Sequence, residues 1–147
     1  MTPSFINARY LAEQRGISVE TAVEPVSESY PSYVEVTTRS AEGEVVITAA
    51  TAPADKVRIT SILGYDVDFI PGKNVIILQY VDGPGRMGKL GTVLGNAGVN
   101  IETMQISVRP DSNIATVLFN VDRAVSGRIQ TDLKNVVDAK SAWFLEL

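Results

Sequence analysis

The amino-acid sequence predicts an α+β protein in two parts. The first part is β-rich, and the second is a βαββαβ unit whose antiparallel four-stranded sheet carries two helices on one face. Three observations predict this. Apolar runs rich in β-branched residues recur at strand length. A glycine-rich loop separates one run, residues 75–78, from a helical pattern. The segment Pro71-Gly72-Lys73 is the clearest boundary, so we expect domains at residues 1–73 and 74–147.

The first part begins with a short expected helix. Residues 5–16 place Ile6 and Tyr10 on one helical face, and Gly16 is suited to end the helix. Residues 19–26 are polar and interrupted by proline, which indicates a connecting segment.

Strands follow this segment. Residues 33–39 alternate valine with polar residues, which is typical of a half-buried strand, and residues 45–51 predict its hairpin partner. Pro53 ends that strand. Residues 56–63 and 65–70 predict further strands.

The second part has the clearest periodicity. Residues 74–81 predict a buried strand, and residues 86–97 predict a helix that ends at Gly98. The remaining elements are expected at 101–109 (with Met104, Ile106 and Val108 on one face), 114–121, a helix with Ser126 as its N-cap, and 142–147. Because a core of about seventy residues is marginal alone, dimerisation is expected to stabilise it.

Composition excludes several function classes. The chain of 147 residues has a formal net charge of −4, no cysteine and no histidine. We therefore expect no metal site and no catalytic residue in it. The diffuse negative charge argues against nucleic acid and anionic membranes as partners. No apolar run approaches the ~20 residues of a membrane helix, and the first residues do not read as a signal peptide, so a cytoplasmic location is expected.

The glycine loop contains a G-x-G-x-x-G pattern at residues 83–88, with Glu102 about twenty residues on. This spacing raises the alternative of a dinucleotide site. Pro84 removes an amide that a pyrophosphate would need, and Asp82 would repel phosphates. The elements that follow also cannot complete a doubly wound parallel sheet. We therefore expect no NAD site in this chain.

Three glycines, Gly88, Gly91 and Gly95, share one face of the predicted helix. Each costs roughly 1 kcal/mol relative to alanine, so a bare face of this kind indicates close approach by another backbone. Tight packing of the helix on its own sheet and close contact with a partner in a dimer both remain open.

The loop and helix suit the two charged groups of a small amino acid. The helix N-terminus offers the N–H groups of Gly85, Arg86 and Met87 to a carboxylate. Asp82 offers its carboxylate to an ammonium group. The alternative role for Asp82 is that of a helix-capping acid.

Two further side chains complete the candidate site. The amide of Asn100 can both donate to and accept from a polar ligand side chain, and Tyr80 can form a wall or offer its hydroxyl. The alternatives are a turn residue for Asn100 and a core aromatic for Tyr80. Asp82 and Asn100 lie at opposite ends of the predicted helix, roughly 20 Å apart by its rise. A two-fold partner could bring Asn100 of one chain to the Asp82 loop of the other.

The segment D-G-P-G-R-M-G-K-L-G-T-V-L-G-N-A-G-V-N-I at residues 82–101 resembles the signature of the ACT domain, a ferredoxin-like βαββαβ regulatory module that binds amino acids, usually across a dimer interface. The resemblance covers residues 74–147. N-A-R-Y-L-A-E-Q-R-G-I at residues 7–17 and G-Y-D-V-D-F-I-P-G-K-N at residues 64–74 resemble the intervening domain of the long-form D-3-phosphoglycerate dehydrogenase family. Gly83 departs from the larger residue common before the proline.

The resemblance implies a regulatory fragment of an NAD-dependent enzyme that starts serine biosynthesis and is inhibited by L-serine. NAD and the catalytic domains would then belong to the longer parent protein, and the chain would form a dimer or tetramer. The positions at which the resemblance places L-serine are Tyr80, Asp82 and Asn100. The full set of residues expected at this site is Tyr80, Asp82, Gly85, Arg86, Met87, Asn100 and Ile101.

The intervening domain of some members binds anionic ligands through basic side chains. The candidates here are Arg39, Lys56, Arg58 and Lys73, with solvated surface charge as the alternative. Two other functions stay open. The chain can be an oligomerisation module of another amino-acid-metabolism enzyme, with no ligand or a different one. It can also be catalytic in its own right, which the lack of histidine, cysteine and a usable nucleotide fold disfavours.

Overall fold

The computed structural model describes residues 2–23, 33–41, 43–52 and 56–147, which form two four-stranded antiparallel sheets. The order in the first sheet is β1-β2-β3-β4, and the order in the second is β6-β7-β5-β8. The elements are α1 (Ala8–Gln14), β1 (Tyr33–Ser40), β2 (Gly43–Ala52), β3 (Lys56–Ile62), β4 (Tyr65–Phe69), β5 (Asn74–Val81), α2 (Arg86–Asn96), β6 (Ile101–Val108), β7 (Ile114–Val121), α3 (Gly127–Val137) and β8 (Ser141–Glu146). The predicted α+β architecture is confirmed.

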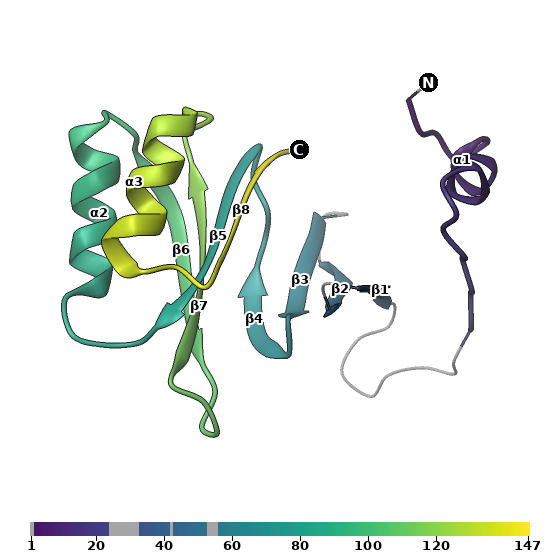
Figure 1. Ribbon diagram of the computed structural model, residues 1–147, viewed down its shortest axis with the longest axis horizontal. Helices are drawn as coiled ribbons and strands as arrows, with labels where there is room; N and C mark the ends of the chain where they lie inside the picture. Colours follow the sequence, from purple (N-terminus) through teal and green to yellow (C-terminus); the bar gives the residue numbers. More distant parts are fainter. Residues whose placement is uncertain (1, 24–32, 42, 53–55) are drawn as a thin grey trace.

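Helices α2 and α3 cover one face of the second sheet (Figure 1). Because side chains alternate along a strand, every second residue of β5 and β7 points toward the helices. The residues that form this core include Ile76, Leu78, Tyr80, Leu90, Leu94, Val117, Phe119, Leu133 and Val137. All ladders in this sheet are antiparallel, so it is not a doubly wound dinucleotide-binding sheet.

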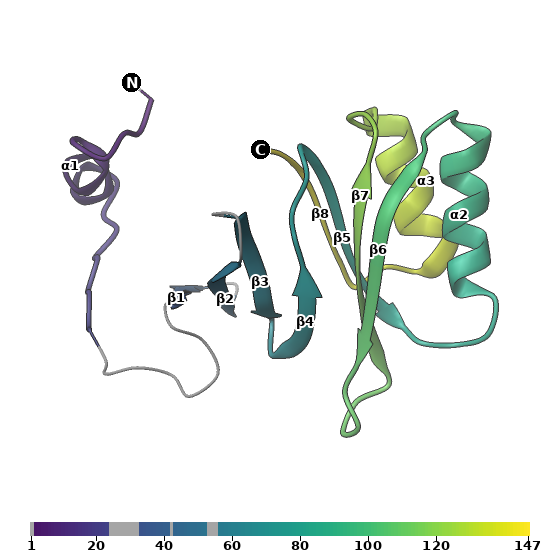
Figure 2. The same cartoon turned by 180° about the vertical axis from the view of Figure 1, so that it is seen from behind.

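The opposite face of the second sheet packs against the first sheet, which lies on the side away from the helices (Figure 2). Val75, Ile77 and Leu118 from the second sheet meet Val67 and Phe69 of β4 in this second core. Strand β5 therefore contributes one row of side chains to each core. Burial on both faces explains why its sequence is a continuous apolar run and does not alternate.

The far side of the first sheet corrects one prediction. Strand β1 was expected to be half-buried, but each of its residues is exposed, with Val34 at 62% and Val36 at 53%. The reason is its position: β1 is the edge strand farthest from β4, and β4 is the strand next to the second sheet. The alternating valines of β1 do share one face of the sheet, but no other element in the described part of the chain covers that face.

Helix α1 lies apart from both sheets (Figures 1 and 2) and has no buried residue. It is followed by Gly16 with a φ of +70°, as predicted. The predictions for residues 24–26 and for Pro53 lie outside the described residues. Among the helices that are described, none has the length and hydrophobicity needed to cross a membrane.

Candidate functional site

The Asp82 loop leaves the end of β5 and leads into α2. The backbone N–H of Asp82 donates to the carbonyl of Asn113 at 2.7 Å, which ties the loop to the β6–β7 turn. The Asp82 side chain is exposed. Gly85 then adopts a left-handed conformation, with φ +79°, at the N-cap of α2. A left-handed N-cap explains the glycine at this position, because other residues pay a steric cost there.

The N-terminus of α2 has no neutralising acid. Its N-cap Gly85 provides no side chain, and its first turn contains no acidic residue. The first backbone N–H groups of a helix carry a partial positive charge, so this end favours an anionic group. Asp82 is not the N-cap, so the structure does not assign it the alternative role of a capping acid. Gly85, Arg86 and Met87 lie together at this helix end, as predicted.

Tyr80 is a fully buried core residue whose hydroxyl reaches the start of α2. The hydroxyl donates to Sδ of Met87 at 3.1 Å. Burial raises the pKa of Tyr80, the negative charge of Asp82 raises that pKa further, and the positive charge of Arg86 opposes the rise. The tyrosine therefore remains a neutral donor that supports the base of the Asp82 loop. Of the two roles considered for Tyr80, a ligand contact or a core aromatic, the structure shows the side chain as a core aromatic.

The Arg86 side chain lies against the end of the other helix. Its guanidinium pairs with Oδ2 of Asp138 at 3.6 Å. Asp138 is the C-cap of α3 and has a left-handed backbone, with φ 52°. This ion pair directs the Arg86 side chain toward α3, and the backbone N–H of Arg86 donates to the carbonyl of Gly83 within the loop at 3.3 Å.

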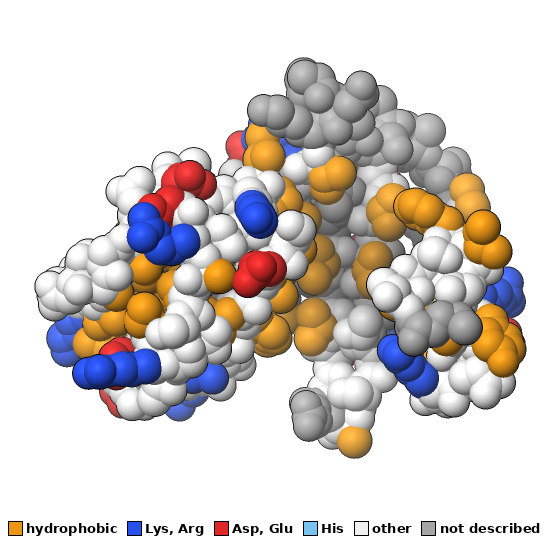
Figure 3. Space-filling model, turned by 90° about the horizontal axis from the view of Figure 1, so that it is seen from above, with side chains coloured by type: hydrophobic (Ala, Val, Ile, Leu, Met, Phe, Trp, Pro, Cys, Tyr) orange, Lys and Arg blue, Asp and Glu red, His pale blue; other side chains and the backbone are white. Residues whose placement is uncertain are grey.

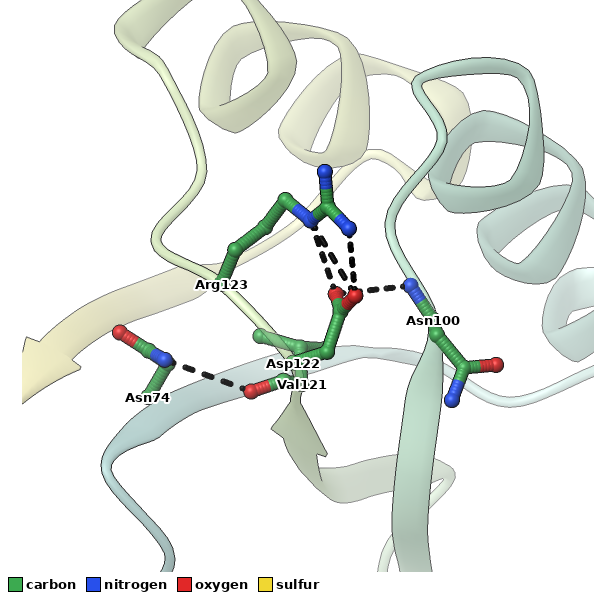
Figure 4. A network of polar contacts seen from close by, with 5 residues as sticks. All are labelled: Asn74, Asn100, Val121, Asp122 and Arg123. Atoms are coloured by element: carbon green, nitrogen blue, oxygen red, sulfur yellow. Dashed lines mark hydrogen bonds and ion pairs between the residues drawn. The ribbon is translucent and has the colours of Figure 1, made fainter.

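Asn100 lies at the other end of α2, in the connection to β6, and Asp122 holds its backbone (Figure 4). The N–H of Asn100 donates to Oδ1 of Asp122 at 3.0 Å, and the N–H of Asp122 donates to the carbonyl of Asn100 at 3.1 Å. Arg123 in turn binds the Asp122 carboxylate. The side-chain amide of Asn100 points away from this network (Figure 4) and is exposed, as a ligand-binding amide must be.

The sequence analysis missed the two residues that support Asn100. Arg123 first, and the Asn100 N–H second, hold the pKa of Asp122 below its usual value. The carboxylate therefore stays charged and keeps the turn fixed. The available signal was an acid–base pair immediately after the apolar run of β7, but only the fold shows that it faces Asn100.

The two halves of the predicted site do not meet within one chain. Asp82 follows the last residue of β5, whereas Asn100 and Ile101 lie beside the first, because Asn74 and Ile101 both pair with Val121. Eight residues of β5 separate the two levels, or roughly 25 Å at about 3.3 Å per residue. This separation agrees with the distance expected from the sequence.

A cavity of about 160 Å³ opens between the start of β5 and the end of β8. Asn74, Val125 and Phe144 line it together with neighbouring residues. None of the residues predicted for the amino-acid site is among its lining residues, so it is a separate feature.

The basic residues considered for anion binding do not converge. Arg39 pairs with Glu44, and Arg58 pairs with Asp68. In the strand pairing, Arg39 lies opposite Glu44 of β2 and Arg58 lies opposite Ala50 of β2. The two arginines are therefore separated by roughly 20 Å along the sheet. Positive and negative side chains also lie next to each other on the face seen from above (Figure 3). The side chain of Lys56 lies outside the described residues, and the role of Lys73 stays a prediction.

Comparisons with known proteins show what the chain is similar to. Residues 74–138 match the ACT domain. The chain is 36% identical over 138 residues to D-3-phosphoglycerate dehydrogenase from Mycobacterium tuberculosis (strain H37Rv), covering 92% of this chain and 26% of that protein. It is 29% identical over 146 residues to the enzyme of that name from Bacillus subtilis, covering 99% and 28%. It is 27% identical over 144 residues to the enzyme of that name from Methanocaldococcus jannaschii, covering 98% of this chain and 27% of that protein. The chain thus spans about a quarter of these relatives' length.

Proposed function

We propose that this chain is a regulatory region that binds L-serine between two copies. The premise is that residues 74–138 form an ACT domain and that nearly the whole chain is homologous to part of the D-3-phosphoglycerate dehydrogenases. In this proposal residues 1–73 belong to an intervening domain and residues 74–147 to the ACT domain. The longer protein, located in the cytoplasm, supplies the NAD and catalytic domains, and bound L-serine inhibits it.

The single observation that carries the proposal is the position of Asp82 and Asn100 at opposite ends of the sheet. Strand β6 is an edge strand of that sheet. In a two-fold pairing of two β6 edges, the start of one strand lies beside the end of the other. Asn100 precedes the start of β6, and the Asp82 loop lies at the sheet end where β6 finishes. Such a pairing therefore brings Asn100 of one copy next to the Asp82 loop of its partner.

The surface of β6 supports this pairing. Met104, Ile106 and Val108 lie opposite core residues of β7, so they point to the helix side of the sheet. Yet they remain 50%, 39% and 45% exposed. An apolar row on an unpaired sheet edge favours association with another strand.

Gly88, Gly91 and Gly95 form one face of α2, the glycine face, which lies on the same side of the sheet as the apolar row of β6. Val93 and Ala97 line a groove shared with Ile129 of α3, so this face of α2 points to α3. Helical spacing places Gly88, Gly91 and Gly95 on the side away from it.

Helix α3 itself lies toward β8, because Lys134 stacks over Phe144 with 5.7 Å between its Nζ and the ring centroid. The glycine face therefore borders the β6 edge. Among the described residues, and apart from the nearby backbone of α2 itself, no atom lies within 4 Å of a Cβ built on any of the three glycines. This open space around the described glycines supports contact with a partner over tight packing within one chain.

Each group of L-serine has a counterpart in the proposed site. The carboxylate accepts hydrogen bonds from the N–H groups at the start of α2, the ammonium binds Asp82, and the hydroxyl binds the amide of the partner copy's Asn100. Tyr80 supports the loop from beneath through Met87. Ile101 positions Asn100 because it is anchored in the core on the helix side of the sheet.

Titration calorimetry with L-serine tests the proposal. We expect saturable heat with the wild-type chain and its loss in Asp82→Ala and in Asn100→Ala. Asp132→Ala and Asn135→Ala, at exposed positions of α3, serve as matched controls and are expected to bind normally. The absence of heat with the wild-type chain, or equal loss in the controls, contradicts the proposal.

The oligomerisation module without a ligand is the second candidate, because the exposed row on β6 favours association whether or not an amino acid binds. It predicts the same dimer in light scattering and no heat with L-serine. Calorimetry and light scattering together therefore separate the two functions. Inhibition by L-serine is tested on the longer protein, as loss of dehydrogenase activity that Asp82→Ala abolishes.

A further inference from the structure

Asn120, on the face of the second sheet away from the helices, makes three hydrogen bonds that the proposed site does not use. Its Oδ1 accepts from the N–H of Gly72 at 2.7 Å. Its Nδ2 donates to the carbonyl of Ile70 at 2.9 Å and to Oγ1 of Thr103 at 2.6 Å. A backbone N–H can only donate and a carbonyl can only accept, so the two contacts with the linker define the orientation of the amide.

The surroundings of this amide are close-packed. Asn120 is only 6% exposed and is adjacent in sequence to Leu118–Phe119, which contribute to both cores. A Cβ built on Gly72 would lie 3.2 Å from both Cγ and Oδ1 of Asn120, so a larger residue there would have to displace the Asn120 amide by a few tenths of an ångström. A buried amide with every hydrogen-bonding atom engaged is a specific arrangement, because an unmatched polar group there would be costly.

Asn120 connects two regions that are distant in the sequence. Ile70 and Gly72 lie in the linker between β4 and β5, immediately after the first sheet. Thr103 lies on β6, three residues after Asn100 and next to an irregularity in the pairing of β6 with β7 between Ile101 and Thr103. The same NH₂ group thus contacts the linker on one side and the Asn100 end of β6 on the other.

We propose that Asn120 is the positioning residue that couples the Asn100 end of β6 to the linker and the first sheet. A shift of Thr103 turns the Asn120 amide, and because that amide is rigid, the bonds to Ile70 and Gly72 change with it. The ligand-dependent part of this inference rests on the proposed function. The coupling itself does not, because all three bonds are formed between residues of one chain.

The coupling is tested first without ligand, by NMR hydrogen exchange of the Gly72 amide in the full chain. Thr103→Val preserves shape and removes the hydroxyl that Asn120 contacts. We expect it to accelerate Gly72 exchange several-fold. Thr116→Val is the matched control, because Thr116 lies on the same face of β7 as Asn120 and its hydroxyl accepts from Nε2 of Gln79 on β5. Unchanged Gly72 exchange in Thr103→Val overturns the proposal.

A double-mutant cycle separates coupling from general destabilisation. In an Asn120→Ala background, Thr103→Val should have no further effect on Gly72 exchange, because the connecting amide is gone. An effect that persists there contradicts the role of Asn120. If Asn120→Ala does not fold, Gly72→Ala is used to displace the amide from the linker side, and it should accelerate exchange at Thr103.

L-serine then tests the transmission of binding. In the wild-type chain and in Thr116→Val it should slow exchange at Gly72 and in β4, whereas Thr103→Val should bind L-serine with a Kd changed less than about twofold and lose that response. An equal response in Thr103→Val overturns the coupling while the proposed function stands. No serine heat in any chain removes the proposed function, and the ligand-free cycle still decides the role of Asn120.

Discussion

Replacing Val108 by lysine should weaken self-association through the β6 edge. Val108 is 45% exposed and lies in the apolar row with Met104 and Ile106. Fully burying such a side chain contributes about 1.5–3 kcal/mol, so covering the exposed part of Val108 contributes about 0.7–1.4 kcal/mol from each protomer. A two-fold interface contains the residue twice, which gives about 1.5–3 kcal/mol per dimer.

This free energy corresponds to a dimer Kd that is roughly ten- to a hundred-fold weaker in Val108→Lys. Sedimentation equilibrium over a dilution series measures the constant directly. The matched control is Val57→Lys on β3, where the valine is 56% exposed and belongs to a different sheet from β6. It should leave the dimer Kd unchanged. Equal weakening in both variants, or none in Val108→Lys, would refute the assignment of the interface to β6.

Three further predictions follow from the same geometry. Because burial raises the pKa of Tyr80 above its ordinary value of 10.0, the unfolding free energy should fall as the pH rises above 10, measured by urea denaturation. Tyr80→Phe should reduce that fall, and an undiminished fall in Tyr80→Phe contradicts the assignment to this side chain. In NMR titration Asp122 should have a pKa below its ordinary value of 3.8, and Arg123→Gln should raise it; an unchanged midpoint contradicts the network. Gly91→Ala should stabilise the monomer by roughly 1 kcal/mol through helix propensity and weaken the dimer; unchanged dimerisation contradicts contact at the glycine face.

The second sheet could be predicted from the sequence because its local signals agree with its packing. The run at residues 75–78 is apolar without alternation, since β5 contributes to a core on each face. Gly98 adopts the left-handed conformation expected after a helix, with φ +67°. Ser126 lies at the N-cap of α3, although its hydroxyl makes no capping bond. In each case the residue type suits the local backbone conformation or burial at its own position, so the sequence alone indicates the element.

The parts that could not be predicted depend on contacts between distant segments. The alternation in β1 indicates which side chains share a face, but whether that face is covered depends on the position of β1 in the first sheet. Asp122 supports Asn100 from 22 residues away, and Asn120 reaches the linker from 50 residues away. Periodicity carries no information about such pairs. The sequence did indicate that Asp82 and Asn100 are too far apart for one chain, because helix length alone determines that distance.

A mixed-subunit titration tests the central claim most directly. Asp82→Ala chains and Asn100→Ala chains are each expected to bind no L-serine. When the two are mixed and allowed to exchange protomers, each mixed dimer regains one intact site, because one protomer supplies Asp82 and the other supplies Asn100. The account predicts that calorimetry of the mixture recovers serine heat that neither variant shows alone. A mixture that forms dimers but gives no heat with L-serine would mean that Asp82 and Asn100 act within one chain or lie outside the site. That result would contradict the account.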